Sequence, residues 1–455
     1  MKVLKKILAF ALAGCLFLTV GVMVACGRSG EGGESSENVV RVGVYNTAKE
    51  KTAIQAVIDS FKSENSDYLT QMGVEDIKLK EIPAGEYQTK IQGMARTGTL
   101  PDVFMTIDTL APKFASQKVS LDLTPYVEQN DEYKALLTDM YESMYEQGIF
   151  NGELHMIARE YSRNVIYYNK TLLSEAGLKA PENDWKWEDF VKYTEKLIKT
   201  ENGKVVQNGA ELTLNWPSNI MPVIYGLGGQ IFDESGNGAV TDATEQAYAQ
   251  LKVLVDSGAV CNTFSGTGTS FSNKTVAMMS GTRASVSDVL SYFGKDSTEW
   301  GVVCFPDMRD ENGNKPYIGA GTSGYSVSAK SANKEVAVKF LMYLISENGQ
   351  KALASTGNFV PVRKSMAEDT CWTSDLDIGL PTDFNHEAFT YNDEYDLDAF
   401  SVMIKDASKQ MEFLTQMNLM TEYYLKYGTN VSSLGYTDVS GWKSYWNTQL
   451  NTVFA

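Results

Sequence analysis

The sequence predicts an α/β protein that begins with a parallel sheet. Short β-branched or apolar runs at residues 39–45, 77–83 and 101–108 predict three strands. Helices are predicted between these strands. Apolar residues recur at helical spacing at positions 54, 57, 58 and 61, and residues 85–97 also predict a helix. A β-α-β-α-β order implies parallel strands joined by right-handed crossovers. Ligands bind at the carboxyl ends of such strands, so the residues that follow each strand are candidate site residues.

The rest of the chain continues the same mixture of strands and helices. Residues 165–178 predict a strand that runs into a helix, and residues 187–199 predict an amphipathic helix. A glycine-rich turn region with a hairpin is expected at residues 226–240. Two strong helices are expected at residues 241–258 and 333–346, and the chain from about residue 369 looks helical and aromatic.

The first residues have the layout of a secretory signal. Three lysines in MKVLKK precede an uncharged apolar stretch at residues 7–25. A retained single-span anchor is the alternative, since about 20 apolar residues can cross a bilayer. The small residues within the stretch and the Gly/Ser/Glu flank after it favour cleavage.

Two cysteines lie in or beside this apolar stretch, and each ends a string that resembles a bacterial lipobox. Cleavage before Cys15 would leave the apolar string LFLTVGVMVA on the mature chain, so we choose Cys26. Lipid on Cys26 would tether the protein to the membrane, because two or three acyl chains give stable anchoring. Residues 1–25 are then the lipoprotein signal peptide, and residues 26–38 are a flexible linker after the lipidated cysteine.

Composition excludes several classes of protein. Removing the three signal lysines takes the formal net charge from −17 to −20, which disfavours binding to nucleic acid. The remaining cysteines, Cys261, Cys304 and Cys371, are odd in number and far apart, so a disulfide framework is not expected. With only two histidines, His155 and His386, a His-rich metal site or a His-dependent nucleophile has few options. We expect no cofactor and no metal.

Several strings occur in an order that resembles one known family. They are PDVFMTID, NVIYYNKTLLSEAGLKAPENDWKWEDF, GLGGQIFDESGN, FSNKTVAMMSGTRA, GTSGYSVSAKSANKEVAVKFLMYLIS and STGNFVPVRKS. Together they resemble a bacterial extracellular solute-binding protein (family 1, sugar-type) that serves an ABC importer, here in lipoprotein form. The resemblance covers nearly the whole mature chain. It implies a receptor that captures a carbohydrate, an oligosaccharide by preference, and delivers it to permease subunits without catalysis.

The family resemblance also implies the architecture. The expected fold is a two-lobe periplasmic-binding-protein-like α/β fold of the class II type, with a ligand cleft between lobes joined by crossover hinge strands. Carried over to this chain, residues 39–109 plus 329–368 form the amino-terminal lobe. Residues 110–328 plus 369–455 form the carboxy-terminal lobe. Hinge closure around the ligand would produce the form that the permease recognises, and we expect a monomer.

A sugar needs an aromatic ring under its apolar face and polar groups around its hydroxyls. In the first lobe the candidates follow the predicted strands: Asn46, Thr47, Glu86, Asp108 and Thr109. Each has an alternative role, as a turn residue, a helix cap or a solvated loop charge. In the second lobe Asn215 and Trp216 match the family's cleft segment, and Trp216 is the stacking candidate. Core packing is the alternative for Trp216, since most tryptophans are used in that way.

Two positions depart from the family's sugar-binding pattern. Arg283 and Ser323 occupy places where the family often has aromatic or other cleft residues. The aromatic surface of the second lobe is therefore reduced, or it is supplied by another ring such as Tyr161, Tyr325 or Tyr391. Two further arginines flank Glu160 and Tyr161. As a hypothesis, Arg159 and Arg163 bind an acidic glycan, because arginine suits bidentate carboxylate contacts. The alternative, which we favour, is that both arginines pair with local acids.

Other classes of protein remain as alternatives. A receptor for a polyamine, an organic acid or a peptide would use the same fold. A cell-surface glycoside-active enzyme needs a pair of carboxylates, and any chain with 57 acidic residues offers such pairs. The sequence contains no GxSxG, Walker A or HExxH string and no zinc-type Cys/His spacing. We therefore expect a binding protein and not an enzyme.

Overall fold

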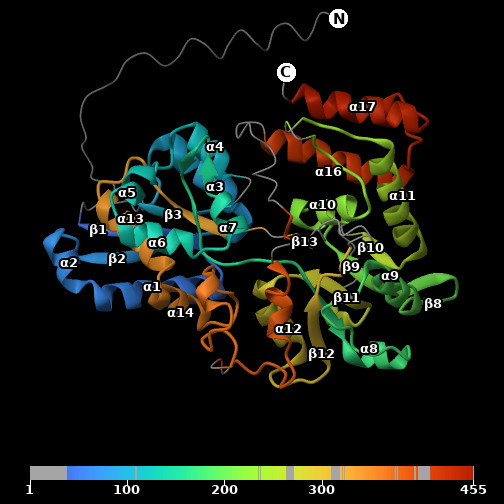
Figure 1. Cartoon of the computed structure of the whole chain (residues 1–455), viewed down its shortest axis with the longest axis horizontal. Coiled ribbons are helices and arrows are strands. Elements are labelled where there is room, and N and C mark those ends of the chain that lie inside the picture. Colours follow the sequence, from blue (N-terminus) through green and yellow to red (C-terminus); the bar gives the residue numbers. More distant parts are fainter. Residues whose placement is uncertain are drawn as a thin grey trace, which may run out of the picture. The chain divides into compact units, whose positions relative to one another are not determined.

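The computed structural model divides into a segment at Met1–Ser36 and a compact unit at Glu37–Ala455. It describes residues 38–107, 110–233, 235, 237–262, 271–308, 318–319, 321, 323–374, 376, 378–393, 396–397 and 410–453. All of these residues belong to the compact unit. The fold is the predicted two-lobe α/β fold, and each lobe is built on its own sheet (Figure 1).

The first sheet has the strand order β2-β1-β3-β14-β6. Its strands are β1 (Val39–Tyr45), β2 (Asp76–Ile82), β3 (Val103–Ile107), β14 (Ser323–Val327) and β6 (Ile157–Ala158). Strand β1 is parallel to β2 and β3, which confirms the predicted β-α-β-α-β unit. Strand β14 is antiparallel to both β3 and β6. The carboxyl ends of β1, β2, β3 and β6 therefore meet at one edge of the sheet.

Helices cover the first sheet, and in Figure 1 they lie together with it as the blue-to-cyan elements and the orange α13 and α14. Helix α1 is amphipathic, and its residues Ala53, Ile54, Val57, Ile58 and Phe61 are all buried. The Phe61 ring meets the Phe340 ring edge to face at 5.4 Å. The elements of this lobe are α1 (Ala48–Glu64), α2 (Ser66–Gln71), η1 (Ala84–Glu86), α3 (Tyr87–Thr97), α4 (Ala111–Ser116), α5 (Thr124–Glu128), α6 (Asp131–Thr138), α7 (Glu142–Glu146), β4 (Ile149–Phe150), β5 (Glu153–Leu154), α13 (Lys334–Leu344) and α14 (Glu347–Ala354).

The second sheet has the strand order β10-β9-β11-β7-β12, and β8 adds to β9. Strands β10 and β11 run parallel to β9, whereas β7 is antiparallel to β11 and β12. The strands are β7 (Val165–Asn169), β8 (Lys199–Glu201), β9 (Lys204–Leu212), β10 (Val260–Asn262), β11 (Val276–Gly281) and β12 (Trp300–Cys304). Its helices are α8 (Lys170–Glu175), α9 (Trp187–Lys196), α10 (Pro217–Gly226), α11 (Asp242–Ser257), η4 (Arg283–Ser285) and α12 (Val286–Phe293).

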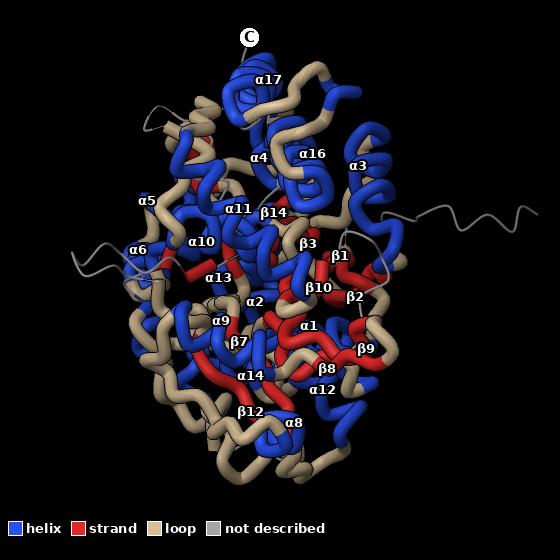
Figure 2. Tube along the Cα trace, turned by 90° about the vertical axis from the view of Figure 1, so that its right-hand side faces the viewer, coloured by secondary structure: helices blue, strands red, loops and turns tan. Residues whose placement is uncertain are grey.

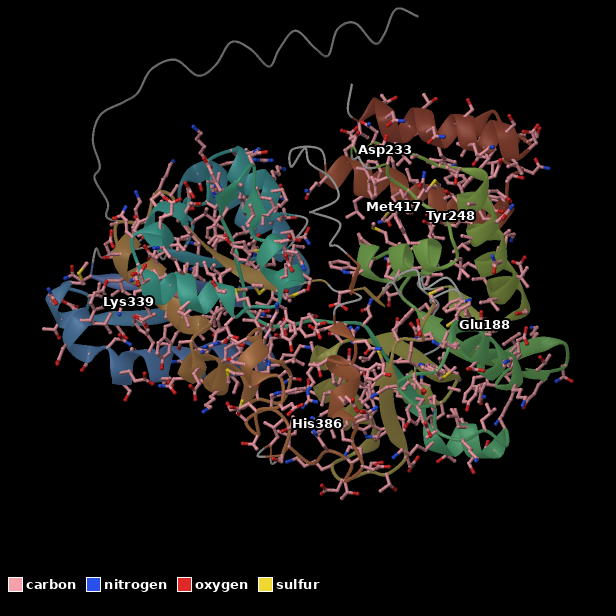
Figure 3. The ribbon with its side chains drawn as sticks, in the orientation of Figure 1. Glu188, Asp233, Tyr248, Lys339, His386 and Met417 are labelled. Atoms are coloured by element: carbon pink, nitrogen blue, oxygen red, sulfur yellow. The ribbon has the colours of Figure 1, made fainter. Side chains whose placement is uncertain are left out.

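The carboxy-terminal helices complete the second lobe. Helices α16 (Gln410–Tyr427) and α17 (Val439–Thr452) lie side by side at one end of the molecule (Figure 2). Helix α16 also packs on α11, where Tyr248 and Met417 are both buried (Figure 3). The Tyr248 hydroxyl lies 2.8 Å from Thr421 Oγ1, so the one polar group on this ring has a partner. The helical prediction for the carboxy-terminal part is confirmed for these two segments.

The expected lobe boundaries differ from the sheet in two places. Strands β6 and β14 belong to the first sheet, although the sequence-based division assigned residues 110–328 to the second lobe. Residues such as Leu123 and Met144 also pack in the core that contains β1 and β3. The division carried over from the family resemblance placed these segments in the second lobe, whereas strand pairing and apolar packing join them to the first.

Candidate functional site

The carboxyl ends of β1 and β2 are tied together by Asn46. Tyr45 pairs with Ile82 at the end of both strands. Asn46 donates its backbone N–H to the Ile82 carbonyl at 3.0 Å, and its side-chain oxygen accepts from the Ala84 N–H at 3.1 Å. Asn46 is exposed, so its amide nitrogen remains accessible at this edge of the first sheet.

Thr47 occupies the position before α1 but does not cap the helix with its side chain. Its hydroxyl oxygen is buried and has no hydrogen-bond partner among the described residues. Buried hydroxyls normally have a partner. This unpaired hydroxyl therefore marks the loop after β1 as a place where a further polar group would be stabilising.

The corresponding edge of the second sheet carries Asn215 and Trp216, which follow β9. Both side chains are exposed, and Trp216 keeps 39% of its surface accessible. The other six tryptophans of the chain are all at most 7% accessible. Trp216 is therefore the one tryptophan that is not used for core packing.

The two edges face each other. Lys49, in the first turn of α1, donates from Nζ to the Ala284 carbonyl at 3.2 Å. The same ammonium lies 3.6 Å from a carboxylate oxygen of Asp288 on α12. Ala284 lies in η4, three residues after the end of β11, so the start of α1 and the segment after β11 are joined by one lysine side chain. The sequence analysis missed Lys49, because no motif marks a contact between residues so far apart.

Trp216 lies beside the segments that cross between the sheets. Asn164 donates from its side chain to the Ser218 carbonyl, and Gly321 donates its N–H to the Ser162 carbonyl at 3.0 Å. A Cβ atom placed on Gly321 would be 3.7 Å from the Trp216 indole nitrogen. The exposed indole is thus next to these two crossing segments, whose conformation changes when the angle between the lobes changes.

Arg159 is buried rather than presented to a ligand. Its two terminal nitrogens donate to the two carboxylate oxygens of Glu50, with 3.0 Å between Nη2 and Oε1. Its Nε donates to Glu160 at 3.2 Å. Burial raises the pKa of Glu160 to about 7, and the Arg159 charge opposes that rise. The predicted ligand contact of Arg159 is replaced by a buried cluster of one arginine and two acids.

Tyr161 and Arg163 form a second buried cluster around Asp396. The Tyr161 hydroxyl and Arg163 Nε both donate to the Asp396 carboxylate, the latter at 2.8 Å. Burial raises the pKa of Asp396 to about 6, and the Arg163 charge again opposes the rise. Both arginines therefore pair with acids of the chain, as the favoured alternative had it, and neither is free for an acidic glycan in this structure.

Arg283 is buried as well, and among the described residues no carboxylate pairs with it. Its guanidinium donates to the Gly357 carbonyl at 2.8 Å and to the Trp372 carbonyl at 3.2 Å. It also lies over the ring of Phe384, 5.0 Å from the centroid. Desolvation lowers the pKa of Arg283 to about 10. Arg283 therefore holds backbone and aromatic groups together instead of reaching the cleft.

The remaining predicted residues fall into four groups. Tyr325 is 1% accessible and so cannot supply a stacking ring, whereas Ser323 and Tyr391 are half-buried. Glu86 is exposed, and its carboxylate lies 3.0 Å from Lys90 on the next turn. Three predicted residues lie outside the described part of the chain: Cys26, Asp108 and Thr109.

Comparison with known proteins assigns the family. The model of the bacterial extracellular solute-binding protein family matches residues 56–395. This chain belongs to that family. The family consists of solute-binding proteins that act outside the cytoplasm, so the predictions of a binding protein without catalysis and of an extracytoplasmic location are confirmed. No helix within the described ranges has the length and apolar character that a membrane span requires.

Two curated relatives cover most of this solute-binding protein. A multiple sugar-binding protein of Streptococcus mutans is 26% identical over 384 residues, which is 81% of this chain and 85% of the relative. A galactooligosaccharide-binding protein of Bacillus subtilis is 23% identical over 387 residues, with 81% and 83% covered.

Solved structures confirm the two-lobe fold. The GacH receptor of Streptomyces glaucescens has a TM-score of 0.69 at 20% identity, and the match covers 91% of this chain and 98% of the receptor. The Listeria monocytogenes ABC substrate-binding protein Lmo0181, solved with cycloalternan, also has a TM-score of 0.69 at 20% identity, with 91% and 97% covered.

Proposed function

We propose that this solute-binding protein is a lipid-anchored receptor that captures a carbohydrate between its lobes and delivers it to the permease of an ABC importer. The observation that carries the proposal is the exposed Trp216, on the sheet edge where Lys49, two residues after Thr47, contacts the segment after the neighbouring strand β11. An exposed aromatic ring beside amides and hydroxyls is the chemistry that a pyranose requires. The sugar-binding names of the relatives support the same class of solute.

The proposed contacts divide by accessibility. Trp216 stacks against a sugar ring, and Asn46 and Asn215 offer amides to its hydroxyls. Thr47 and Ser323 add hydroxyls, and Glu86, Asp108 and Thr109 remain proposed contacts from the sequence. Arg159, Tyr161, Arg283 and Tyr325 form the rigid wall behind these groups, because all four are at most 3% accessible. A micromolar ligand needs about −8 kcal/mol in total, so several of the accessible contacts must act together.

A thermal-shift and calorimetry screen tests the solute class. The chain from Ser29 keeps the whole compact unit Glu37–Ala455 and is suitable for it. Mono- and oligosaccharides, uronates, polyamines and amino acids are the probes. A ligand at 100 times its dissociation constant adds about 2.7 kcal/mol of stability. A shift with one glycan that is recovered intact supports a carbohydrate receptor. Shifts with polyamines or amino acids alone contradict the solute, and a cleaved glycan contradicts the receptor.

Trp216→Ala locates the binding site. Loss of one stacking ring removes about 1–2 kcal/mol, so the affinity should fall by about 5- to 30-fold. Tyr292→Ala is the matched control, since Tyr292 is another exposed aromatic residue, on α12, at 57% accessibility. Trp216→Phe should retain most of the affinity. If both alanine variants bind like the parent, the ligand does not stack on Trp216.

The anchor is tested separately, on the full-length chain in a bacterial host. Residues 1–25 would be removed, Cys26 would carry the lipid, and residues 26–38 would be the linker. Cys26→Ser should abolish labelling by radioactive palmitate and release the protein from the membrane fraction. Cys15→Ser is the matched control and should change neither readout. If Cys15→Ser abolishes labelling and Cys26→Ser does not, the lipidation site is Cys15. If the parent protein itself is not labelled, the proposal of a lipid anchor is refuted.

A further inference from the structure

A cavity is formed by Asp296, which follows α12, and by residues of the segment 373–386. It measures about 390 Å³, which is within the range of small-molecule sites. None of the residues proposed above as accessible ligand contacts lines it. The side chains that matter for its chemistry are Asp296, Thr373, Ser374, Thr382, Phe384 and His386. Three hydroxyls, one carboxylate, one imidazole and one aromatic ring therefore converge on this cavity.

The rim of this cavity is held by a close backbone approach. Gly379 has a φ of 77° and accepts at its carbonyl from the Asp296 N–H at 2.8 Å. A Cβ atom on Gly379 would come within 2.6 Å of the Lys295 Cβ. The position therefore requires glycine for both its conformation and its space. This contact fixes the Asp296 side of the cavity against the segment that carries Thr382 and Phe384.

The imidazole of His386 has a fixed protonation state. Its Nδ1 lies 3.3 Å from Nη1 of Arg283, which can only donate. Nδ1 must therefore accept, and the proton is on Nε2. Burial, together with the Arg283 charge, lowers the pKa of His386 to about 4, so the ring stays neutral above pH 5. Within the described part of the chain Nε2–H has no hydrogen-bond partner, so it is available as a donor (Figure 3 shows the place of His386).

The groups around the cavity match an uncharged polyol. The Asp296 carboxylate accepts hydrogen bonds, and the Ser374 and Thr382 hydroxyls accept and donate them. The Thr373 hydroxyl already donates to the Asp369 carbonyl at 3.1 Å, so it can only accept from a ligand. His386 donates one hydrogen bond, and Phe384 offers an apolar surface. An anion is disfavoured because Asp296 repels it and the neutral His386 supplies no opposing charge. We propose that this cavity is a second binding site that takes a single uncharged sugar residue.

Histidine NMR provides a direct test, since the chain contains only His155 and His386. His155 is buried in the first lobe, where its Nδ1 lies 3.1 Å from the Ser120 hydroxyl, and it serves as the internal control. The chain from Ser29 with ¹³C-labelled histidine would be titrated with D-glucose, D-galactose and D-glucuronate. His386→Gln assigns the two signals.

The proposal expects a saturable shift of the His386 signal with glucose or galactose and no shift of His155. A ligand of this size should bind with a dissociation constant of about 1 mM. Asp296→Asn with Thr382→Val should weaken this binding at least about fivefold, and glucuronate should bind more weakly than glucose.

Arg283 touches His386 and also follows β11 at the cleft edge, so a ligand in the cleft could move the same signal. The Trp216→Ala variant separates the two sites. A His386 shift that persists in Trp216→Ala supports a second site, even if the cleft takes no sugar. A shift that disappears with Trp216→Ala, tighter binding of glucuronate, or no shift at 100 times the expected constant overturns the proposal.

Discussion

Glu50→Gln should destabilise the protein strongly although it changes one oxygen to one nitrogen. Glu50 and Arg159 have side chains that are 6% and 4% accessible, and they form a two-bond pair in the first lobe. A glutamine can accept one of the two Arg159 bonds, but its NH₂ group would face a guanidinium N–H. The substitution therefore removes a negative charge, breaks one hydrogen bond and places the new NH₂ group against an Arg159 N–H, where both groups are donors.

The loss of stability depends on the one acid that still pairs with Arg159, which is Glu160. Breaking a buried ion pair usually costs about 3–5 kcal/mol, because an uncompensated charge stays inside. Glu160 still accepts from Arg159 Nε at 3.2 Å, so Arg159 keeps one carboxylate. We therefore expect the lower end of the range, about 3 kcal/mol.

Urea unfolding at pH 7 measures the change, with the slope m checked for constancy. Glu86→Gln is the matched control, since Glu86 is 65% accessible and pairs only with Lys90 one turn away. That surface pair contributes a few tenths of a kcal/mol at most. If the free energies of unfolding of Glu50→Gln and Glu86→Gln differ by less than about 0.5 kcal/mol at equal m, the Glu50–Arg159 pair does not contribute the stability assigned to it.

Three further predictions concern proton binding, backbone conformation and hinge motion. The folded-state pKa of Glu160, about 7, lies above its ordinary value of 4.5. The folded protein therefore binds the extra proton between these pH values, and stability falls as pH rises through this window, by at most about 1.4 kcal/mol per pH unit. Glu160→Gln should flatten this part of the stability-pH curve, and an unchanged slope would contradict the assignment. Gly379→Ala should destabilise more than Gly73→Ala, since both glycines have φ near 70–77° but a Cβ atom at Gly73 meets nothing within 4 Å; equal losses in urea unfolding would show that the close approach at Gly379 is unimportant. Hydrogen exchange of the Gly321 amide, which donates to Ser162, should slow when ligand is bound, because closure protects the crossing segments. If the exchange rate is unchanged at saturating ligand, the hinge lies at other residues.

The elements of the first sheet could be predicted because their signals are local. The run VVRVGVY and the helix after it are marked by β-branched residues and by apolar residues at helical spacing, and both were found within a few residues of the predicted bounds. The membership of β14 in this sheet could not be predicted in the same way. Its pairing with β3 joins residues that are more than 200 positions apart, and no local pattern encodes such a partner.

The site was predicted less completely for a related reason. Trp216 was selected from seven tryptophans by resemblance, and only tertiary packing distinguishes it as the exposed one. Arg283 was expected at the cleft from its place in the family pattern, and Arg159 was a hypothetical contact for an acidic glycan, with pairing to local acids favoured. Their acceptors, Glu50 and the Gly357 carbonyl, come from distant segments that the sequence does not connect to them.

The two buried arginine clusters also indicate where the lobes can bend. Arg159 is fixed to Glu50 on α1 of the first lobe, and four residues later Arg163 lies 3.9 Å from the sulfur of Cys304 on β12 of the second. Because Arg159 and Arg163 are each held by one lobe, the backbone can rotate only in the short interval between these two residues. Ser162 lies in that interval and accepts a backbone hydrogen bond from Gly321 of a second crossing segment. Rotation of the lobes should therefore be concentrated at Ser162 and Gly321, and Trp216 is adjacent to Gly321. A ligand stacked on Trp216 would then act directly beside the pivot, which gives a physical reason for binding and closure to be coupled in this solute-binding protein.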